Sequence, residues 1–251
     1  MFVTCPLTSG IKRLDMMLGG FETGKLILLE GDLSASSLSH LLCVRSQLPV
    51  ERGGFDSPVI WLDGGNTFNI YSIIEISRGL GLDPERVLRS IYLSRAFTCH
   101  QMSSLVLEKL WDAVKRFESK LVLISDLPSL YLESDIPREE AVKVFVPVVE
   151  ELRNSPNRKD VLILATSLEY PFVDGKSQVS EILASNADFI LRTRQRSGGV
   201  EVELEKHSSK KAKKFVLGAE VLGVVPLDEF AGGDGRWVGP FQHSGPLSRM
   251  R

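Results

Sequence analysis

Four apolar runs rich in β-branched residues alternate with amphipathic segments over most of the chain. The apolar runs span residues 26–30, 58–63, 120–125 and 160–166. In the intervening segments 38–47, 70–80, 101–118 and 138–154, apolar residues recur every three or four positions, as in helices packed through one face. Buried strands that alternate with helices predict an α/β fold: a doubly wound, mostly parallel sheet with helices on both faces.

The pattern changes after residue 187. Shorter strands are expected at 188–193, 200–206 and 214–217, joined by basic or turn-forming links such as Ser197-Gly198-Gly199. Links of this kind indicate antiparallel strands that extend the sheet at one edge. We assign residues 1–230 to this core and 231–251 to a Gly- and Pro-rich tail, which we expect to be mobile or docked through Trp237 and Phe241.

Composition narrows the class of protein. The 251 residues are 43% hydrophobic and 25% charged, which fits one large globular domain. The formal net charge of −2 gives no overall basic field, so contact with nucleic acid would need a local patch. We expect no membrane span, because the sequence has no apolar run of about 18 residues, and we expect reduced cysteines and a cytoplasmic location.

Several sequence blocks occur in order between residues 8 and 102. They read TSGIKRLDMMLGGFETGKLILLEGD, QLPVERGG, VIWLDGGNTF and GLDPERVLRSIYLSRAFTCHQM. Together they resemble the ATPase core of RecA/RadA-type recombinases. KaiC-like ATPases share the first block, but not the second or the fourth as well. The resemblance implies a RecA-like fold and a role in homologous recombination and DNA repair. The family's N-terminal helix-hairpin-helix domain is expected to be absent, since the core begins within the first ten residues.

The resemblance places the family's phosphate loop at residues 31–38. Gly31 keeps the first glycine of the GxxxxGK[ST] motif, and Ser34 lies within the loop. Ser36, Ser37 and Leu38 replace the second glycine, the lysine and the Mg²⁺-binding hydroxyl group. Serine cannot neutralise a phosphate, and leucine cannot bind a hard cation. This region therefore predicts a phosphate loop that lacks the groups that neutralise phosphate and bind Mg²⁺.

Three further family positions are altered. Gly65 stands at the catalytic glutamate, Ser125 at the metal-orienting aspartate, and Thr166-Ser167 at the pair that senses γ-phosphate. Asp126 either reaches into the site or caps the following turn, and we favour the cap. The changes predict that ATP hydrolysis is lost and that no cofactor is required, although weak ATP binding without hydrolysis stays open.

The segments aligned with the family's DNA-binding loops, 132–139 and 167–185, carry more acidic than basic residues, which predicts weak phosphate binding by either loop. One basic cluster follows, made of Lys206, His207, Lys210, Lys211, Lys213 and Lys214. It is a solvated hairpin, a DNA-phosphate patch, or a contact through Lys206 and Lys210 to a neighbouring subunit's γ-phosphate. Arg192, Arg194 and Arg196 alternate along a nearby strand and are expected to extend the patch.

We interpret the chain as a catalytically inactive RecA/RadA paralog. It would act as an accessory or mediator by binding a protein, either a RadA-type recombinase or another paralog, and DNA through the basic cluster. Two alternatives stay open: a nucleotide-binding switch that does not hydrolyse ATP, and a KaiC-like regulatory scaffold.

Overall fold

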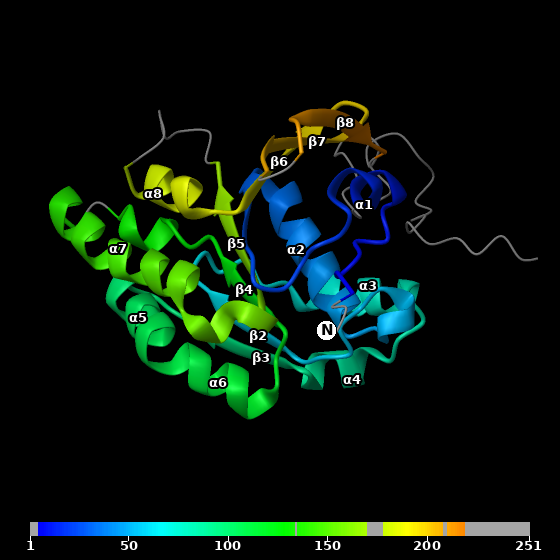
Figure 1. The fold of residues 1–251 in the computed structure, drawn as a ribbon, viewed down its shortest axis with the longest axis horizontal. Helices are drawn as coiled ribbons and strands as arrows, with labels where there is room; N and C mark the ends of the chain where they lie inside the picture. The colour runs from blue at the N-terminus through cyan, green and yellow to red at the C-terminus, as the bar shows by residue number, and fades with distance from the viewer. Residues whose placement is uncertain (1–4, 134, 170–177, 208–209, 219–251) are drawn as a thin grey trace, which may run out of the picture.

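The computed structural model describes residues 5–133, 135–169, 178–207 and 210–218, which form a single eight-stranded sheet (Figure 1). The strand order is β3-β2-β4-β5-β1-β6-β7-β8. Neighbouring strands from β3 to β6 are parallel, and β7 is antiparallel to both β6 and β8. The strands are β1 Leu26–Gly31, β2 Val59–Asp63, β3 Ile91–Arg95, β4 Leu121–Ser125, β5 Leu162–Leu168, β6 Phe189–Arg196, β7 Gly199–Lys206 and β8 Lys213–Leu217.

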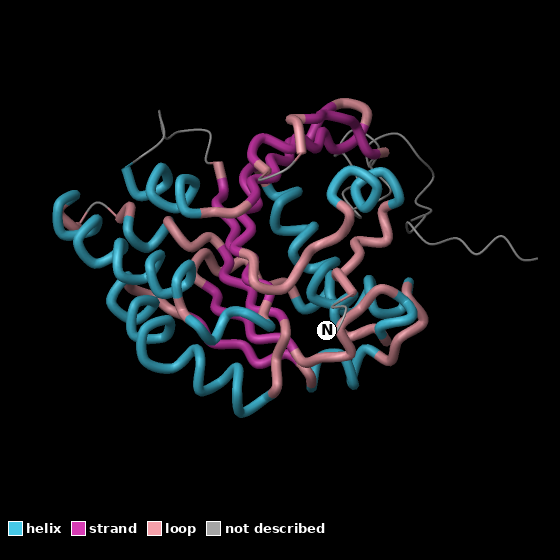
Figure 2. The backbone as a smooth tube through the Cα atoms, viewed as in Figure 1, coloured by secondary structure: helices cyan, strands magenta, loops and turns pink. Residues whose placement is uncertain are grey.

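Helices cover both faces of the sheet (Figure 2). One face packs against α1–α4 and the other against α5–α8. Together with the strands they confirm the predicted mostly parallel α/β fold with antiparallel strands at one edge. The α-helices are α1 Lys12–Leu18, α2 Leu33–Ser46, α3 Ile70–Gly79, α4 Pro84–Arg89, α5 Cys99–Ser104, α6 Leu110–Phe117, α7 Arg138–Asn154 and α8 Gln178–Asn186. Short 3₁₀ helices span Val50–Arg52, Ser129–Tyr131 and Pro156–Asp160, and a π-helical turn, Leu105–Lys109, joins α5 to α6.

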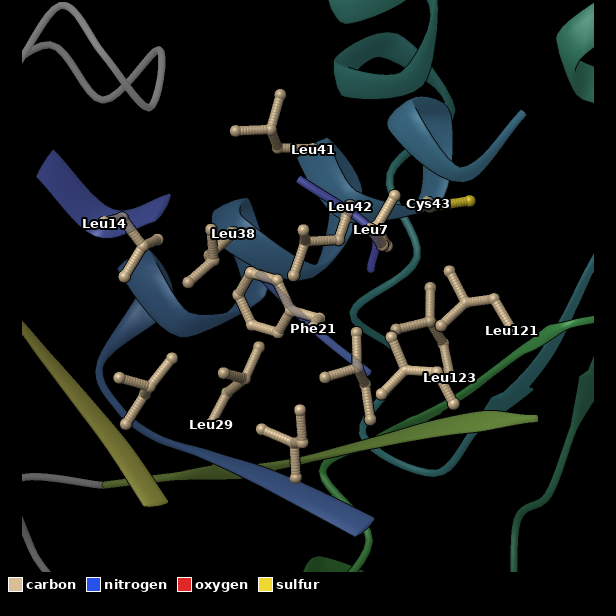
Figure 3. Close-up of a cluster of buried hydrophobic side chains, with 14 of the residues drawn as sticks. Leu7, Leu14, Phe21, Leu29, Leu38, Leu41, Leu42, Cys43, Leu121 and Leu123 are labelled. Carbon is tan, nitrogen blue, oxygen red and sulfur yellow. The ribbon is translucent and has the colours of Figure 1, made fainter. Parts of the chain in front are cut away.

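The two cores explain why β1 is a continuous apolar run. Ile27 and Leu29 belong to the core beneath α2, and Leu28 belongs to the core beneath α7 and α8. A strand covered on both faces needs apolar residues at every position. In Figure 3, Leu38 on α2 lies near Phe21 and Leu29 in the first of these cores.

Three element assignments differ from those expected. α2 begins at Leu33 rather than at residue 38, because Asp32 caps the helix. The sequence analysis missed β3, an edge strand whose residues are only half-buried or exposed and so lack the apolar signal of the inner strands. The strand expected at 188–193 is not wholly antiparallel: β6 runs to Arg196 and pairs in parallel with β1 on one side.

No helix in the described part of the chain is both long enough and apolar enough to cross a membrane. The predicted tail at 231–251, with Trp237 and Phe241, lies outside the described residues, as do positions 170–177 of the second expected DNA loop.

Candidate functional site

The positions singled out by the sequence meet at the carboxyl edge of the parallel strands. Gly31 ends β1, Gly65 follows β2, Ser125 ends β4, and Thr166 lies near the end of β5. β1 and β5 are neighbours, but the helices after them, α2 and α8, pack on opposite faces of the sheet. Ligands of open α/β sheets bind in the crevice at such a point. The expected nucleotide positions are therefore brought together.

Helix α2 starts directly after β1, and its first turn is closed by Asp32. One carboxylate oxygen of Asp32 accepts hydrogen bonds from the backbone N–H of Ser34 at 2.9 Å and from its hydroxyl group at 2.5 Å. The other accepts the backbone N–H of Gln195 on β6 at 2.5 Å. The positive end of a helix is where a bound phosphate would be held. Here a side chain of the protein itself lies at that position.

The residues aligned with the phosphate loop are part of α2. Leu38 is buried in the core, with 1% of its surface exposed. The Ser36 carbonyl accepts hydrogen bonds from the Ser39 hydroxyl group at 2.7 Å and from His40 Nδ1 at 2.6 Å, and the Ser37 hydroxyl group donates to the Leu33 carbonyl at 3.2 Å. From Leu33 onward, this segment therefore forms a helix and not an open loop.

His40 links the start of α3 to α2. Its Nε2 accepts the backbone N–H of Asn69 at 2.9 Å, while Nδ1 faces the Ser36 carbonyl. A carbonyl only accepts, so Nδ1 carries the proton and the ring is neutral. Burial against Trp61, with ring centroids 4.9 Å apart, lowers the pKa of His40. The Asn69 side chain in turn caps α3. His40 thus has a structural role in joining the two helices.

The Asp126 side chain fills the space that a side chain at position 65 would need. A Cβ atom on Gly65 would lie 2.4 Å from the Asp126 Cβ and 2.9 Å from its Oδ2. Asp126 has a positive φ of 47° and is almost fully buried, and its Oδ1 accepts the backbone N–H of Leu168 at 3.0 Å. The expectation that the Asp126 side chain caps the following turn is wrong: the side chain binds β5, and only its carbonyl accepts from Ser129.

Ser125 belongs to a buried polar network. Its hydroxyl group donates to Asp63 at 2.6 Å and accepts the Trp61 indole N–H at 3.1 Å. The second Asp63 oxygen pairs with the Arg95 guanidinium at 3.0 Å. Both oxygens of Asp63 are therefore engaged within the chain. Ser125, which was expected to replace the metal-orienting aspartate, holds β2 and β4 together.

Thr166 likewise supports the Asp126 turn. Its hydroxyl group accepts the backbone N–H of Asp126 at 2.7 Å, and its carbonyl accepts that of Leu127 at 3.0 Å. The side chain is buried, while the neighbouring Ser167 is half-buried. Thr166 therefore fixes the conformation that places Asp126 against Gly65.

A double-mutant cycle tests this shared space. We expect Gly65→Glu to lower the free energy of unfolding by about 2 kcal/mol, because it overpacks the Asp126 side chain. In an Asp126→Gly background, which keeps the positive φ accessible, the same substitution should cost at least about 1 kcal/mol less. Urea unfolding of the four proteins measures the coupling. Additive energies would contradict the shared-space interpretation.

Several of the predicted basic residues bind groups of their own chain. Lys206 Nζ donates to the carbonyls of Ala184 and Ser185 at the end of α8, at 3.1 and 2.8 Å, and burial lowers its pKa. The His207 ring lies against the Phe189 ring, with centroids 4.4 Å apart and the planes tilted by 30°, and burial lowers the pKa of His207 as well. Lys206, for which a contact with a neighbouring subunit was one of three alternatives, is therefore engaged at α8.

The arginines of β6 are paired with glutamates. Arg192 lies 2.7 Å from Glu30 and 2.8 Å from Glu205, and Arg194 lies 3.0 Å from Glu169. The prediction that Arg192 and Arg194 extend a cationic patch is wrong, because these carboxylates neutralise them locally. The sequence carried a signal for this: glutamates alternate with apolar residues along 201–205, and one face of β7 is therefore acidic.

The sequence analysis missed two residues that shape the site. Asp32 was not considered, although an aspartate before a helical segment is a common N-cap. Arg95 was not considered because β3 was not predicted, and its pairing with Asp63 joins residues 32 positions apart. Only the fold brings Arg95 and Asp63 together.

Comparison with known proteins adds an independent line of evidence. A family model described as Rad51 matches residues 3–138. A DNA repair and recombination protein RadA of Aeropyrum pernix is 34% identical over 137 residues, which cover 53% of this chain and 42% of that protein. The chain thus matches less than half the length of this relative. The matched region contains α1 to α6 and the carboxyl ends of β1, β2 and β4.

Proposed function

Because this chain belongs to the Rad51 family, we propose that it is a member that has lost ATP hydrolysis and acts in homologous recombination and DNA repair by binding a protein partner. That partner would be a RadA-type recombinase or another paralog of it. The observation that carries the proposal is the start of α2, where the Asp32 carboxylate binds the Ser34 and Gln195 backbone N–H groups in place of a phosphate.

Electrostatic repulsion argues against the binding of a triphosphate at the start of α2. A phosphate at the start of α2 would meet Asp32, and like unit charges about 4 Å apart repel by about 4 kcal/mol at an effective dielectric constant of about 20. Neither Ser37 nor Leu38 supplies the cation or the metal ligand that would offset this repulsion. Gly65 supplies no base to activate water, and Asp126 fills the space beside it.

Exposed apolar side chains support a role in protein binding. Leu33, Tyr71 and Phe97 are 72%, 75% and 70% exposed, although each is large and apolar or aromatic. They follow β1, β2 and β3, so all lie toward the carboxyl edge of the sheet. In the strand order, β1 lies four positions from β3, so the three side chains are spread along this edge of the sheet. Large exposed apolar side chains along one edge are candidates for contact with an extended protein surface. We name Leu33, Tyr71 and Phe97 the apolar edge.

Hydrolysis by the purified chain tests the catalytic half of the proposal. We expect a steady-state ATPase rate at least about 1000-fold below that of a RadA-type recombinase assayed in parallel, since one lost catalytic group costs about 10²- to 10⁴-fold. Thermal unfolding should not shift with Mg²⁺-ATP. A Mg²⁺-dependent shift without turnover would instead favour a nucleotide-binding switch, and turnover would refute the proposal.

Co-elution with purified RadA-type recombinase tests the partner half. Leu33→Glu/Phe97→Glu should abolish the complex, because both charges fall on the apolar edge. Val50→Glu/Leu107→Glu, the same change in charge at two exposed apolar residues outside the apolar edge, should leave the complex intact. Equal binding by the two variants would exclude the apolar edge as the contact.

A further inference from the structure

Strand register divides the basic cluster of residues 206–214 between two faces. Lys214 pairs with Glu203 of β7, and Lys213 pairs with Leu204. Directly opposed residues of antiparallel strands point to the same face, and successive residues point to opposite faces. Lys214 therefore lies on the glutamate face of β7. Lys213 lies on the other face, where Leu204 joins the core that includes α1.

The glutamate face is neutralised. Besides the pairs made by Arg192 and Arg194, Glu201 lies 3.3 Å from Arg196 and 3.0 Å from Lys214. These two cations lower the pKa of Glu201, the hydrogen bond from Lys214 being the larger cause. The cations on this face already have carboxylate partners, so they are poorly placed to bind an external anion.

The other face carries lysines of the predicted basic cluster together with two cations of α1, Lys12 and Arg13, that were not part of that cluster. α1 lies beside β8 (Figure 1), where Arg13 Nη1 donates to the Val216 carbonyl at 3.3 Å and its guanidinium carbon lies 5.7 Å from the centre of the Phe215 ring. Lys210 Nζ lies next to Gly19 at the end of α1, 3.0 Å from where a Cβ would be. We name this group the α1–β8 surface; its cations are Lys12, Arg13, Lys210, Lys211 and Lys213.

Within the described ranges, none of the five cations has a carboxylate at ion-pair distance. The acidic residue of α1, Asp15, is held by the Ser9 and Gly10 backbone N–H groups at 2.7 and 3.0 Å. All five cations except the half-buried Lys210 are exposed. The surface is therefore a concentrated positive charge on a chain whose formal net charge is −2.

We propose that the α1–β8 surface binds the phosphate backbone of a nucleic acid without reading its sequence. Lysine ammonium groups are compact point charges that suit phosphates spaced along a strand. Four of the five cations are lysines, distributed over α1, the link between β7 and β8, and the start of β8, so they fit an extended polyanion better than a single small anion. This inference extends the proposed role in recombination, but it depends on a surface other than the nucleotide site or the apolar edge.

Fluorescence anisotropy with a labelled DNA oligonucleotide tests the proposal at about 50 and about 200 mM salt, a range over which phosphate contacts weaken steeply. Lys210→Glu/Lys211→Glu should weaken binding at least tenfold and reduce the salt slope by about 2, since each lost phosphate contact removes about 1. Lys12→Glu should also weaken binding and so show that α1 takes part.

The matched control is Lys109→Glu/Lys115→Glu, the same change in net charge on exposed residues of the helices covering the opposite face of the sheet. It should change the affinity for DNA less than twofold, and unfolding temperatures should show that all variants fold. Unchanged affinity in Lys210→Glu/Lys211→Glu would overturn the proposal. So would loss of recombinase binding with DNA affinity intact, because the surface would then contact protein. ATP turnover would refute the proposed function but leave this result standing.

Discussion

Replacement of Gly31 by alanine is expected to lower the free energy of unfolding by about 3 to 5 kcal/mol, because it combines backbone strain with a clash against a neighbouring strand. Gly31 ends β1 with a φ of 141°, and a Cβ there would lie 1.8 Å from the Thr193 carbonyl oxygen on β6. A backbone carbonyl cannot relieve the clash by changing rotamer, as a side chain can. Thermal unfolding should show a decrease of about 10 °C in Tm.

Two other glycines separate the causes. Gly81 has a φ of 70° but nothing within 4 Å of an added Cβ, so Gly81→Ala should cost only the strain, about 1 kcal/mol. Gly198 has neither a positive φ in the strained range nor a close neighbour, and Gly198→Ala should be nearly neutral. If Gly31→Ala unfolded no more easily than Gly81→Ala, the close packing of β1 against β6 at this position would be refuted.

Introducing the phosphate-loop residues of the family is expected to destabilise the chain without producing ATP binding. In Ser36→Gly/Ser37→Lys/Leu38→Thr, the core loses buried methyl groups of Leu38 and gains a hydroxyl group, and α2 gains a glycine. Together these changes should cost about 3 kcal/mol or more. Asp32 would still cap α2, so Mg²⁺-ATP should produce no thermal shift.

The double variant Ser36→Gly/Ser37→Lys keeps Leu38 in the core and provides a better-folded test. Ser37→Lys alone should be within about 0.5 kcal/mol of the unmodified chain, since Ser37 is only half-buried. Isothermal calorimetry with Mg²⁺-ATP measures binding by each protein. Saturable binding by either the double or the triple variant would show that the motif residues, and not the helical start of α2, prevent nucleotide binding.

The inner strands were predictable because burial on both faces leaves a continuous apolar run, as in β1, β2 and β4. The edge strand β3 was not, because none of its residues is buried: two are half-buried and three are exposed. Asp32 is a recognisable N-cap signal for the early start of α2, but the resemblance to the family places a phosphate loop at residues 31–38 instead.

The arrangement within the candidate site was less predictable. The conflict between Gly65 and Asp126 depends on a positive φ at Asp126 and on the approach of β2 to β4, and neither leaves a sequence signal. Likewise, the division of the basic cluster into a paired and an unpaired face depends on the register of β7 and β8. Charge counted along the chain cannot distinguish Lys213 from Lys214.

The shared space of Gly65 and Asp126 also constrains how this protein can evolve. A glutamate arising at 65 would first meet the Asp126 side chain, while loss of the Asp126 side chain alone would give up its bond to Leu168 and bring no new activity. Each single step is therefore expected to be deleterious, even if the pair together were tolerated. Selection acting on one mutation at a time is therefore not expected to introduce a glutamate at position 65.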